Sequence, residues 1–306
     1  MINELKALAE KKGDKLEVVS IDRLQIMRDE IDKLQQEGNL NGFQTWIVNK
    51  LYKYNFGKER FTRRSVIIVA VPLPASYANV TFGRNGREYK FYATVAANLA
   101  RTGKYLTDAV KKAGYAIKYE GFLPLKRLAV QSGLAEYGKN NITYIEGLGS
   151  YLSYTAYSTD MPCEEDRWRD VTVSPVCENC GICAGNCPTG AIPQDRFLLN
   201  NEKCLTAMNE NTRDFPDWLP QTAHHTPFDC LKCQACCPMN AERRNVIDVS
   251  FNEAETERLL AGKPYTDASK ELKQKVKLLG LDSWASIPRN LRTLFDAMDQ
   301  GYVPSL

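Results

Sequence analysis

Apolar residues recur at helical spacing in two parts of the N-terminal half of the chain. Residues 24–34 place one apolar side chain per turn on a single face, formed by Leu24, Met27, Ile31 and Leu34. We predict a helix here, with Ser20 as its N-cap and Gly38 as its stop. Residues 89–113 show the same spacing before Gly114, so they predict a second, longer helix.

Short apolar runs predict strands between and after these helices. Residues 64–72 form a β-branched run that ends at prolines, which is typical of a buried strand. Residues 141–145 and 151–159 predict two further strands, joined by a glycine-rich turn. Near the end of the chain, the pattern predicts helices at 251–262, 266–279 and 289–299. Helices and strands do not alternate strictly, which favours an α+β fold over a doubly wound sheet.

Composition fits an ordinary globular protein and adds little about partners. The chain has 306 residues, of which 43% are hydrophobic and 25% charged, and its net charge is +3. No apolar run is long enough to span a bilayer, and no apolar signal core opens the chain. We therefore expect a cytoplasmic protein with no membrane partner.

Ten cysteines occur in the chain, and all but Cys163 lie within the stretch 177–237. In a reducing compartment such thiols are metal ligands more often than disulfide partners. They form two motifs, Cys177-x2-Cys180-x2-Cys183-x3-Cys187-Pro188 and Cys230-x2-Cys233-x2-Cys236-Cys237-Pro238. This is the spacing of bacterial ferredoxins that bind two [4Fe–4S] clusters, in which the cysteine before proline ligates the other cluster.

The motif rule gives a ligand set for each cluster. The first cluster takes Cys177, Cys180, Cys183 and Cys237. The second takes Cys187, Cys230 and Cys233, together with a fourth ligand that is either Cys204 or Cys236. Paired zinc sites are the alternative, but zinc usually takes two CxxC pairs rather than this run.

The remaining candidate ligands have a weaker case. Cys163 stands apart from both motifs, so we interpret it as an ordinary thiol. His224 and His225 are the two histidines of the chain, and we expect them on a loop without a ligand role. With the cysteines placed, the chain divides into an α/β cofactor and substrate domain at 1–160, a two-cluster ferredoxin-like domain at 161–245 and a helical C-terminal tail at 246–306.

The segment before the cysteines resembles a known enzyme family. Residues 125–140, LKRLAVQSGLAEYGKN, are similar to the segment LAVRAGLGWxGKN of epoxyqueuosine reductases. The following residues resemble that family's paired strands, which end in Thr-Asp, here Thr159 and Asp160. In that family an isolated cysteine after the first motif helps to hold the second cluster. The resemblance covers roughly 64–240 and favours Cys204 over Cys236 as the eighth ligand.

The resemblance implies a cofactor, an activity and a cellular role in queuosine biosynthesis. Epoxyqueuosine reductases are related to reductive dehalogenases, and both place a cobalamin, with its base detached, in a nitroreductase-like domain beside two [4Fe–4S] clusters. We therefore expect a cobalamin-dependent oxidoreductase in which electrons pass through the clusters to the corrinoid, which reduces an electrophilic substrate. A turn formed by Gly138, Lys139, Asn140 and Asn141, together with Asp160, is expected to contact the cobalamin.

The resemblance fails where the family carries its proposed general acid, an aspartate. In this chain, depending on a one-residue gap, the matching residue is Glu120 or Tyr119. A glutamate can replace the aspartate if burial raises its pKa, whereas a tyrosine donor is typical of reductive dehalogenases. Each could equally be a strand residue with structural contacts only. Both stay open as catalytic candidates.

Partners and rival functions follow from the same features. We expect a low-potential electron donor of the ferredoxin or flavodoxin type. Residues 52–64 mix basic and aromatic side chains, a pattern that suits tRNA but equally suits a solvated basic face. The substrate is a modified tRNA nucleoside or a small organic molecule, as in reductive dehalogenases. The rival hypothesis is a ferredoxin-type electron-transfer protein that serves a separate corrinoid partner.

Overall fold

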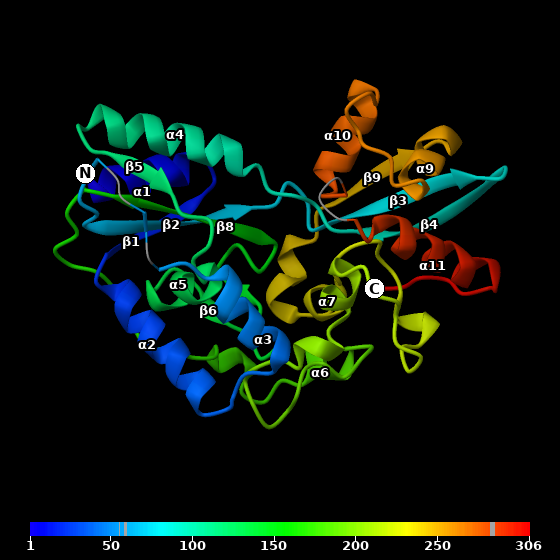
Figure 1. The fold of residues 1–306 in the computed structure, drawn as a ribbon, viewed down its shortest axis with the longest axis horizontal. Helices are drawn as coiled ribbons and strands as arrows, with labels where there is room; N and C mark the ends of the chain where they lie inside the picture. Colours follow the sequence, from blue (N-terminus) through cyan, green and yellow to red (C-terminus); the bar gives the residue numbers. More distant parts are fainter. Residues whose placement is uncertain (55, 58–59, 282–284) are drawn as a thin grey trace. The chain divides into compact units, whose positions relative to one another are not determined.

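The computed structural model describes residues 1–54, 56–57, 60–281 and 285–306 and separates the chain into two compact units (Figure 1). The first unit comprises residues 1–72 and 97–180. The second comprises residues 73–96 and 181–306. The domain boundaries expected after residues 160 and 245 differ from the boundaries of these units. Residues 73–96, expected in the first domain, belong to the second unit.

A four-stranded antiparallel sheet forms the centre of the first unit. Its order is β1 (Lys15–Ser20), β2 (Ser65–Pro72), β8 (Leu152–Thr159) and β5 (Ile117–Tyr119). The side chains of β2 are buried on both faces of the sheet, which explains its continuous apolar run. One face packs against Leu5 of α1 and against Leu106 and Val110 of α4. On the other side, α5 contacts β2 and β8.

Helices and a second, smaller sheet complete the first unit. Its helices are α1 (Ile2–Lys11), α2 (Arg23–Gln36), α3 (Gly42–Trp46), η1 (Ile47–Leu51), α4 (Leu99–Lys112), α5 (Leu125–Gln131) and η2 (Pro175–Cys177). A two-stranded sheet pairs β6 (Glu136–Tyr137) with β7 (Thr143–Tyr144). In the part of the chain that the structure describes, no helix has the length and apolar character needed to cross a bilayer.

The second unit contains a three-stranded sheet in the order β4 (Arg87–Ala93), β3 (Tyr77–Arg84) and β9 (Val246–Phe251). The β3–β4 pair is an antiparallel hairpin, whereas β3 and β9 pair in parallel across a large sequence separation. Phe82 lies at the centre of the core and stacks on Phe91 and Phe251, with ring centroids 4.9 and 4.7 Å apart. This sheet therefore pairs a hairpin from the first half of the sequence with a strand from the second half.

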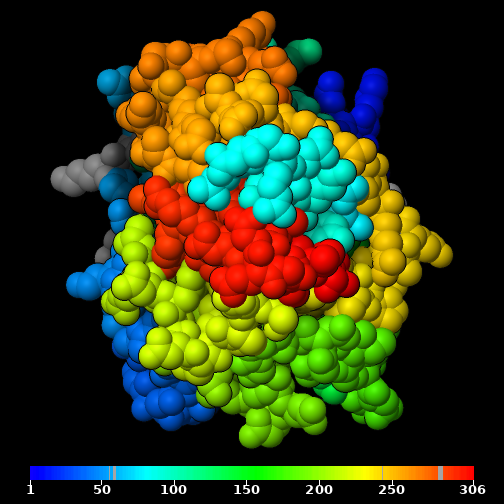
Figure 2. Space-filling model, turned by 90° about the vertical axis from the view of Figure 1, so that its right-hand side faces the viewer, coloured from blue at the N-terminus to red at the C-terminus, as the bar shows by residue number. Residues whose placement is uncertain are grey.

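Helices α9 (Glu253–Leu260), α10 (Lys270–Leu278) and α11 (Ile287–Asp299) complete this core. Figure 2 shows the β3–β4 hairpin, in cyan, beside the red C-terminal helix on one face of the unit. Arg87 and the Tyr89 hydroxyl both donate to Asp299, at 2.9 and 2.8 Å. The cysteine loops contain only short elements, namely α6 (Ile182–Gly185), η3 (Asn201–Lys203), α7 (Leu205–Glu210), η4 (Gln221–Ala223), α8 (Lys232–Ala235) and η5 (Pro238–Arg243).

Several local predictions agree with the structure and three do not. Residues 24–34 lie in α2, and residues 64–72 coincide with β2. Ser20, however, ends β1, and Asp22 occupies the N-cap position. Residues 89–113 are β4 followed by α4, because Tyr89, Phe91 and Ala93 alternate inward at a spacing of two. The tail at 246–306 is not wholly helical, since it begins with β9.

Candidate functional site

Four cysteine thiols of the second unit come together around the second motif. Cys187 follows α6, Cys204 is the N-cap of α7, and Cys230 and Cys233 stand before and in α8. The charges of Cys204 and Cys187 raise the pKa of Cys230, and the charges of Cys230, Cys204, Cys187 and Cys183 raise that of Cys233. Only thiols that lie near one another affect each other in this way.

Burial is the larger cause of these shifts. It raises the pKa of the Cys230 thiol to about 12 and that of Cys233 well above its ordinary value. Burial also raises the pKa of Cys204. Thiolates are the form that binds metal, so this pocket of thiols holds negative charge only when a bound cation compensates it. The four groups therefore have the chemistry of ligands rather than of free reactive thiols.

Backbone amides point at three of these sulfur atoms. The Ala191 amide donates to Cys187 Sγ at 3.3 Å. The backbone amides of Thr206 and Ala207 form hydrogen bonds to Cys204, and that of Lys232 forms one to Cys230, and each of these bonds lowers the thiol pKa. Hydrogen bonds of this kind stabilise thiolates and tune the potential of a bound cluster.

Cys204 is a candidate for the fourth ligand position. Its charge raises the pKa of both Cys230 and Cys233. Cys236 ends α8, where its charge and that of Cys230 oppose the lowering of the Lys232 pKa by burial. Among the residues that the structure describes, no three His, Cys, Asp or Glu side chains are grouped to hold one metal ion. Ligands of a cubane each bind a different iron atom, so they need not surround a single point.

The first motif spans the boundary between the two units. Cys177 and Cys180 end the first unit, where the Cys177 amide donates to Ser174 and the Cys180 amide to Cys177. Cys183 lies on α6 of the second unit, and α6 contacts α8. The grouping of these cysteines with Cys237 therefore remains a prediction from the spacing.

His224 and His225 lie on the loop after η4, as expected, but both are buried. The His224 ring meets Phe215 edge-on, with centroids 4.5 Å apart. Burial, with a smaller effect of the Arg289 charge, lowers the pKa of His224 to about 4. Burial lowers the pKa of His225 to about 4 as well, and its ring nitrogens contact Ala223 and Leu231. Nothing in the sequence pattern indicated these contacts.

The two candidate proton donors have different environments. Glu120 is nearly buried and accepts from Arg63 at 3.3 Å and from the Ser158 hydroxyl at 2.7 Å. Tyr119 is 57% exposed, and its ring lies 5.8 Å from that of Tyr157. The Tyr119 ring also lies so close to Gly121 that a Cβ there would overlap it. The carboxylate is therefore held within the fold, whereas the phenol reaches the surface.

In the turn expected to contact cobalamin, the side chain of Asn140 makes hydrogen bonds to nearby residues of the same segment. The Asn140 side chain donates to the Tyr144 hydroxyl and accepts from the Ile142 amide, at 2.9 and 3.2 Å. A Cβ at Gly138 would lie 2.7 Å from Asn140 Oδ1 and 2.8 Å from the Tyr144 ring, so glycine is needed for this packing. Asn141 adopts a positive φ of 58°. The turn is thus rigid, and its glycine makes room for Asn140 and Tyr144.

The other two residues of that prediction also have partners within the fold. Lys139 Nζ donates to the Glu178 carbonyl at 2.7 Å. Asp160 accepts from the Ala116 amide at 2.8 Å and so connects β8 to the segment before β5. These contacts give both polar side chains a structural role.

Some side chains of the basic and aromatic stretch 52–64 point into the fold and others point to solvent. Its residues 55, 58 and 59 lie outside the described residues. The Arg63 guanidinium lies over the rings of Phe56 and Phe61, at 4.6 and 5.6 Å, while it contacts Glu120. Arg63 therefore stabilises the fold. Lys53 lies 4.6 Å from the ring of Phe122, which is 54% exposed, and this pair is open to solvent.

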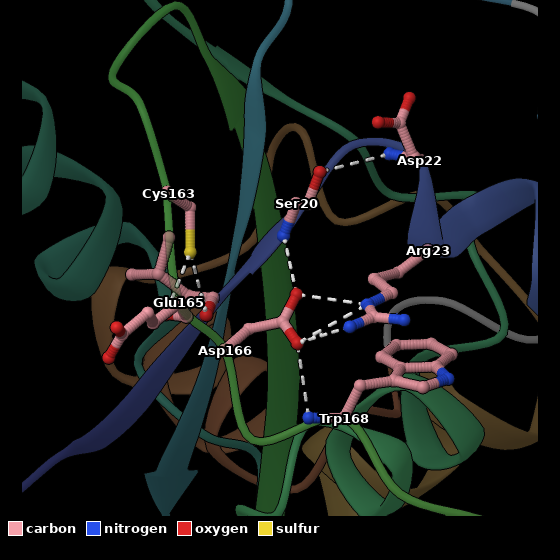
Figure 3. Close-up of polar contacts among 8 residues, drawn as sticks. Ser20, Asp22, Arg23, Cys163, Glu165, Asp166 and Trp168 are labelled. Carbon is pink, nitrogen blue, oxygen red and sulfur yellow. Dashed lines mark hydrogen bonds and ion pairs between the residues drawn. The ribbon is translucent and has the colours of Figure 1, made fainter.

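Cys163 lies beside a separate polar cluster of the first unit (Figure 3). Its thiol donates to the carbonyls of Val18 and Glu165, and burial raises its pKa. Next to it, Asp166 accepts from Arg23 and from the backbone amides of Ser20 and Trp168. The cluster connects the segment after β8 to β1 and α2.

Comparison with known protein families identifies the class of domain that contains the cysteines. Residues 176–240 match the family described as "4Fe-4S double cluster binding domain". The chain therefore contains an iron–sulfur domain for two clusters, as the cysteine spacing predicted.

Individual related proteins show more specifically what the chain is similar to. The chain is 26% identical to epoxyqueuosine reductase of Aliivibrio fischeri over 169 residues, which cover 55% of this chain and 44% of that protein. It is 22% identical to epoxyqueuosine reductase of Lactococcus garvieae over 77% of this chain and 68% of that one. Tetrachloroethene reductive dehalogenase of Dehalobacter restrictus is 26% identical over 51% of this chain and 28% of its own length. The resemblance to epoxyqueuosine reductases is thereby confirmed, although the chain spans less than half of the first of these relatives.

Solved structures show the same fold. An epoxyqueuosine reductase with a modified tRNA-Tyr stem loop superposes with a TM-score of 0.65 at 18% identity, covering 97% of this chain and 82% of that one. The enzyme from Streptococcus thermophilus gives 0.65 at 19% identity, covering 97% and 81%. The mixed α and β architecture of the chain is thus that of epoxyqueuosine reductases over nearly its whole length.

Proposed function

We propose that the chain is an iron–sulfur oxidoreductase of the epoxyqueuosine reductase type. The observation that carries this proposal is the grouping of Cys187, Cys204, Cys230 and Cys233, each with burial or an amide contact suited to a thiolate ligand. The fold shared with epoxyqueuosine reductases supports the same conclusion. Electrons come from a low-potential donor of the ferredoxin or flavodoxin type.

The cysteine spacing provides four ligands for each of two [4Fe–4S] clusters. One is held by Cys187, Cys204, Cys230 and Cys233, and the other by Cys177, Cys180, Cys183 and Cys237. When bound, the clusters supply single-electron transfer at low potential. The chain contributes amide donors to the sulfur atoms and a partly buried setting for the second group.

A base-off cobalamin in a nitroreductase-like domain is the finer part of the proposal. It rests on the sequence resemblance to epoxyqueuosine reductases. Of the side chains expected to hold it, Asn140 and Asp160 direct polar atoms to partners within the fold. We therefore derive no chemical step through the corrinoid.

Proton delivery to a substrate is assigned to Tyr119 rather than Glu120. A proton donor must reach the reacting group, and an exposed phenol does so more readily than a carboxylate held by Arg63 and Ser158. Glu120 then acts as a structural residue that fixes the end of β5, since its amide also donates to the Ala156 carbonyl at 2.8 Å.

The substrate is a modified tRNA nucleoside, by similarity to the structure solved with a tRNA stem loop. The sequence similarity to a tetrachloroethene reductive dehalogenase supports a second candidate, a reductase of small organic molecules. Turnover of epoxyqueuosine-containing tRNA against turnover of an organohalide distinguishes the two.

The test begins with the full chain, purified without oxygen and reconstituted with iron and sulfide. After incubation with cobalamin and desalting, retained corrinoid absorption with a base-off spectrum supports the reductase. Iron–sulfur absorption with all the corrinoid removed contradicts it and leaves an electron carrier that serves another protein. Absence of iron–sulfur absorption contradicts the proposal at its first step.

A further inference from the structure

The imidazole of His225 forms a hydrogen bond through each of its nitrogen atoms. The side chain is fully buried, with an exposure of 0%. Its Nδ1 lies 2.7 Å from the Ala223 carbonyl, and the Leu231 amide donates to its Nε2 at 3.2 Å. A carbonyl only accepts and an amide N–H only donates, so Nδ1 carries the proton and Nε2 is the acceptor.

The backbone of His225 is fixed from a third direction. Its carbonyl accepts from the Tyr92 amide of β4 at 3.0 Å. The residue is therefore attached to the three-stranded sheet through its backbone, and to the end of η4 and the start of α8 through its ring. These three hydrogen bonds hold the imidazole of His225 in one position, and the imidazole in turn holds the Leu231 amide.

The hydrogen bond to His225 Nε2 holds the loop between Cys230 and Cys233, two proposed ligands of the second cluster. Leu231 follows Cys230 directly, and the next amide, that of Lys232, forms a hydrogen bond to the Cys230 thiol. The Leu231 carbonyl accepts from the amides of Gln234 and Ala235, at 3.0 and 2.8 Å. Leu231 is thus held at its amide by His225 and at its carbonyl by α8, and this sets the direction of the Lys232 amide.

We infer that His225 is a positioning residue for the second iron–sulfur cluster, because it fixes the Cys230–Cys233 backbone and thereby the amide hydrogen bond to the Cys230 sulfur. The inference rests on the proposed function only in that a cluster binds there. Hydrogen bonds to ligating sulfur atoms set cluster potentials, so a change in this loop changes one potential and not both.

The protonation state of the ring agrees with this role. Burial lowers the pKa of His225 to about 4, which keeps the imidazole neutral near neutral pH. A neutral ring keeps Nε2 free to accept from Leu231.

Two variants with similar polarity separate positioning from simple packing. His225→Asn keeps a polar group near Nδ1 but is too short to accept from the Leu231 amide. His225→Gln is longer and can place its carbonyl oxygen near the position of Nε2. His224→Asn is the matched control, because His224 is the adjacent buried histidine and its ring contacts Phe215.

The measurement is a redox titration of the reconstituted full chain, followed by electron paramagnetic resonance, together with iron content per chain. We expect His225→Asn to shift the potential or the signal of one cluster and leave the other as in the wild type. Loss of about half the iron supports the inference equally, since one of two four-iron clusters is then lost. His225→Gln restores wild-type behaviour, and His224→Asn leaves both potentials unchanged.

Unchanged potentials and iron content in His225→Asn overturn the inference, and so do equal shifts in both clusters or the same shift in His224→Asn. A His225→Gln protein that behaves like His225→Asn also overturns it, because the acceptor would then have no role. Failure of the proposed function at its iron–sulfur step looks different, since the wild-type chain would then bind no clusters at all.

Discussion

Arg63 donates to Glu120 from both Nε and Nη2, at 3.3 Å each, and the two side chains are only 11% and 12% exposed. Ser158 of β8 donates to the same carboxylate oxygen at 2.7 Å. The pair connects the segment before β2 to the end of β5. Burying one member of such a pair without the other is costly, so each residue depends on its partner.

This arrangement predicts different effects for the two candidate proton donors. Tyr119→Phe removes the phenolic proton and should lower kcat by about 100-fold or more, the usual contribution of a positioned acid. Glu120→Gln should lower thermal stability and leave kcat within about tenfold, because it weakens the contact with Arg63. Both are measured as reduction of epoxyqueuosine-containing tRNA by the reconstituted enzyme. A Tyr119→Phe enzyme with full activity would remove Tyr119 from the mechanism.

The ligand assignment predicts unequal roles for Cys204 and Cys236. Cys204→Ala should reduce the iron content by about half, because the second cluster loses a thiolate that is also held by the Thr206 and Ala207 amides. Cys236→Ala is the matched control and should keep the full content. Iron and sulfide analysis of anaerobic protein decides between them. The reverse result would assign the eighth position to Cys236.

Acid pH should weaken the second unit through His224. Its pKa is lowered from 6.5 to about 4 by burial, so the unfolded chain binds its proton more readily than the folded one. Stability from this group is complete above about pH 6.5 and is lost as the pH falls toward 4.

His224→Phe keeps an aromatic ring beside Phe215 and removes the titration. The variant should therefore show a shallower fall in melting temperature between pH 6.5 and 4 than the wild type. Scanning calorimetry at several pH values provides the comparison. Parallel curves for the two proteins would show that His224 does not carry this dependence.

The stacked rings of the second unit predict a large stability effect. Phe82 is fully buried between Phe91 and Phe251, so Phe82→Ala should destabilise the unit by about 3–5 kcal/mol. Phe122→Ala, at an exposed ring, is the control and should change stability by about 0.5 kcal/mol or less. Denaturant unfolding of both variants gives the values. Equal effects would mean that the ring stack adds little.

Local chemistry was predictable from the sequence where spacing alone determines it. The Cys-x2-Cys runs indicated the clusters, and the apolar run of β2 indicated a strand buried on both faces. The alternation at Tyr89, Phe91 and Ala93 was missed because apolar residues at short intervals also match a helix. Over a few residues, the two periods cannot be separated.

Contacts between distant residues were not predictable from one sequence. The partner of Glu120 is Arg63, which lies far away along the chain and next to two aromatic residues that suggested a different role. The burial of His225 depends on the loop that follows it and on β4. No pattern along the chain carries this information, because these contacts arise only when separate strands and loops assemble.

The parallel pairing of β3 with β9 has a consequence for how the protein is made. A ribosome releases the β3–β4 hairpin early, but the strand that completes its sheet emerges only after both cysteine motifs have been synthesised. The hairpin therefore waits with an exposed edge, and such edges are prone to pair with other chains. Folding of the second unit therefore cannot be completed before the last stage of translation.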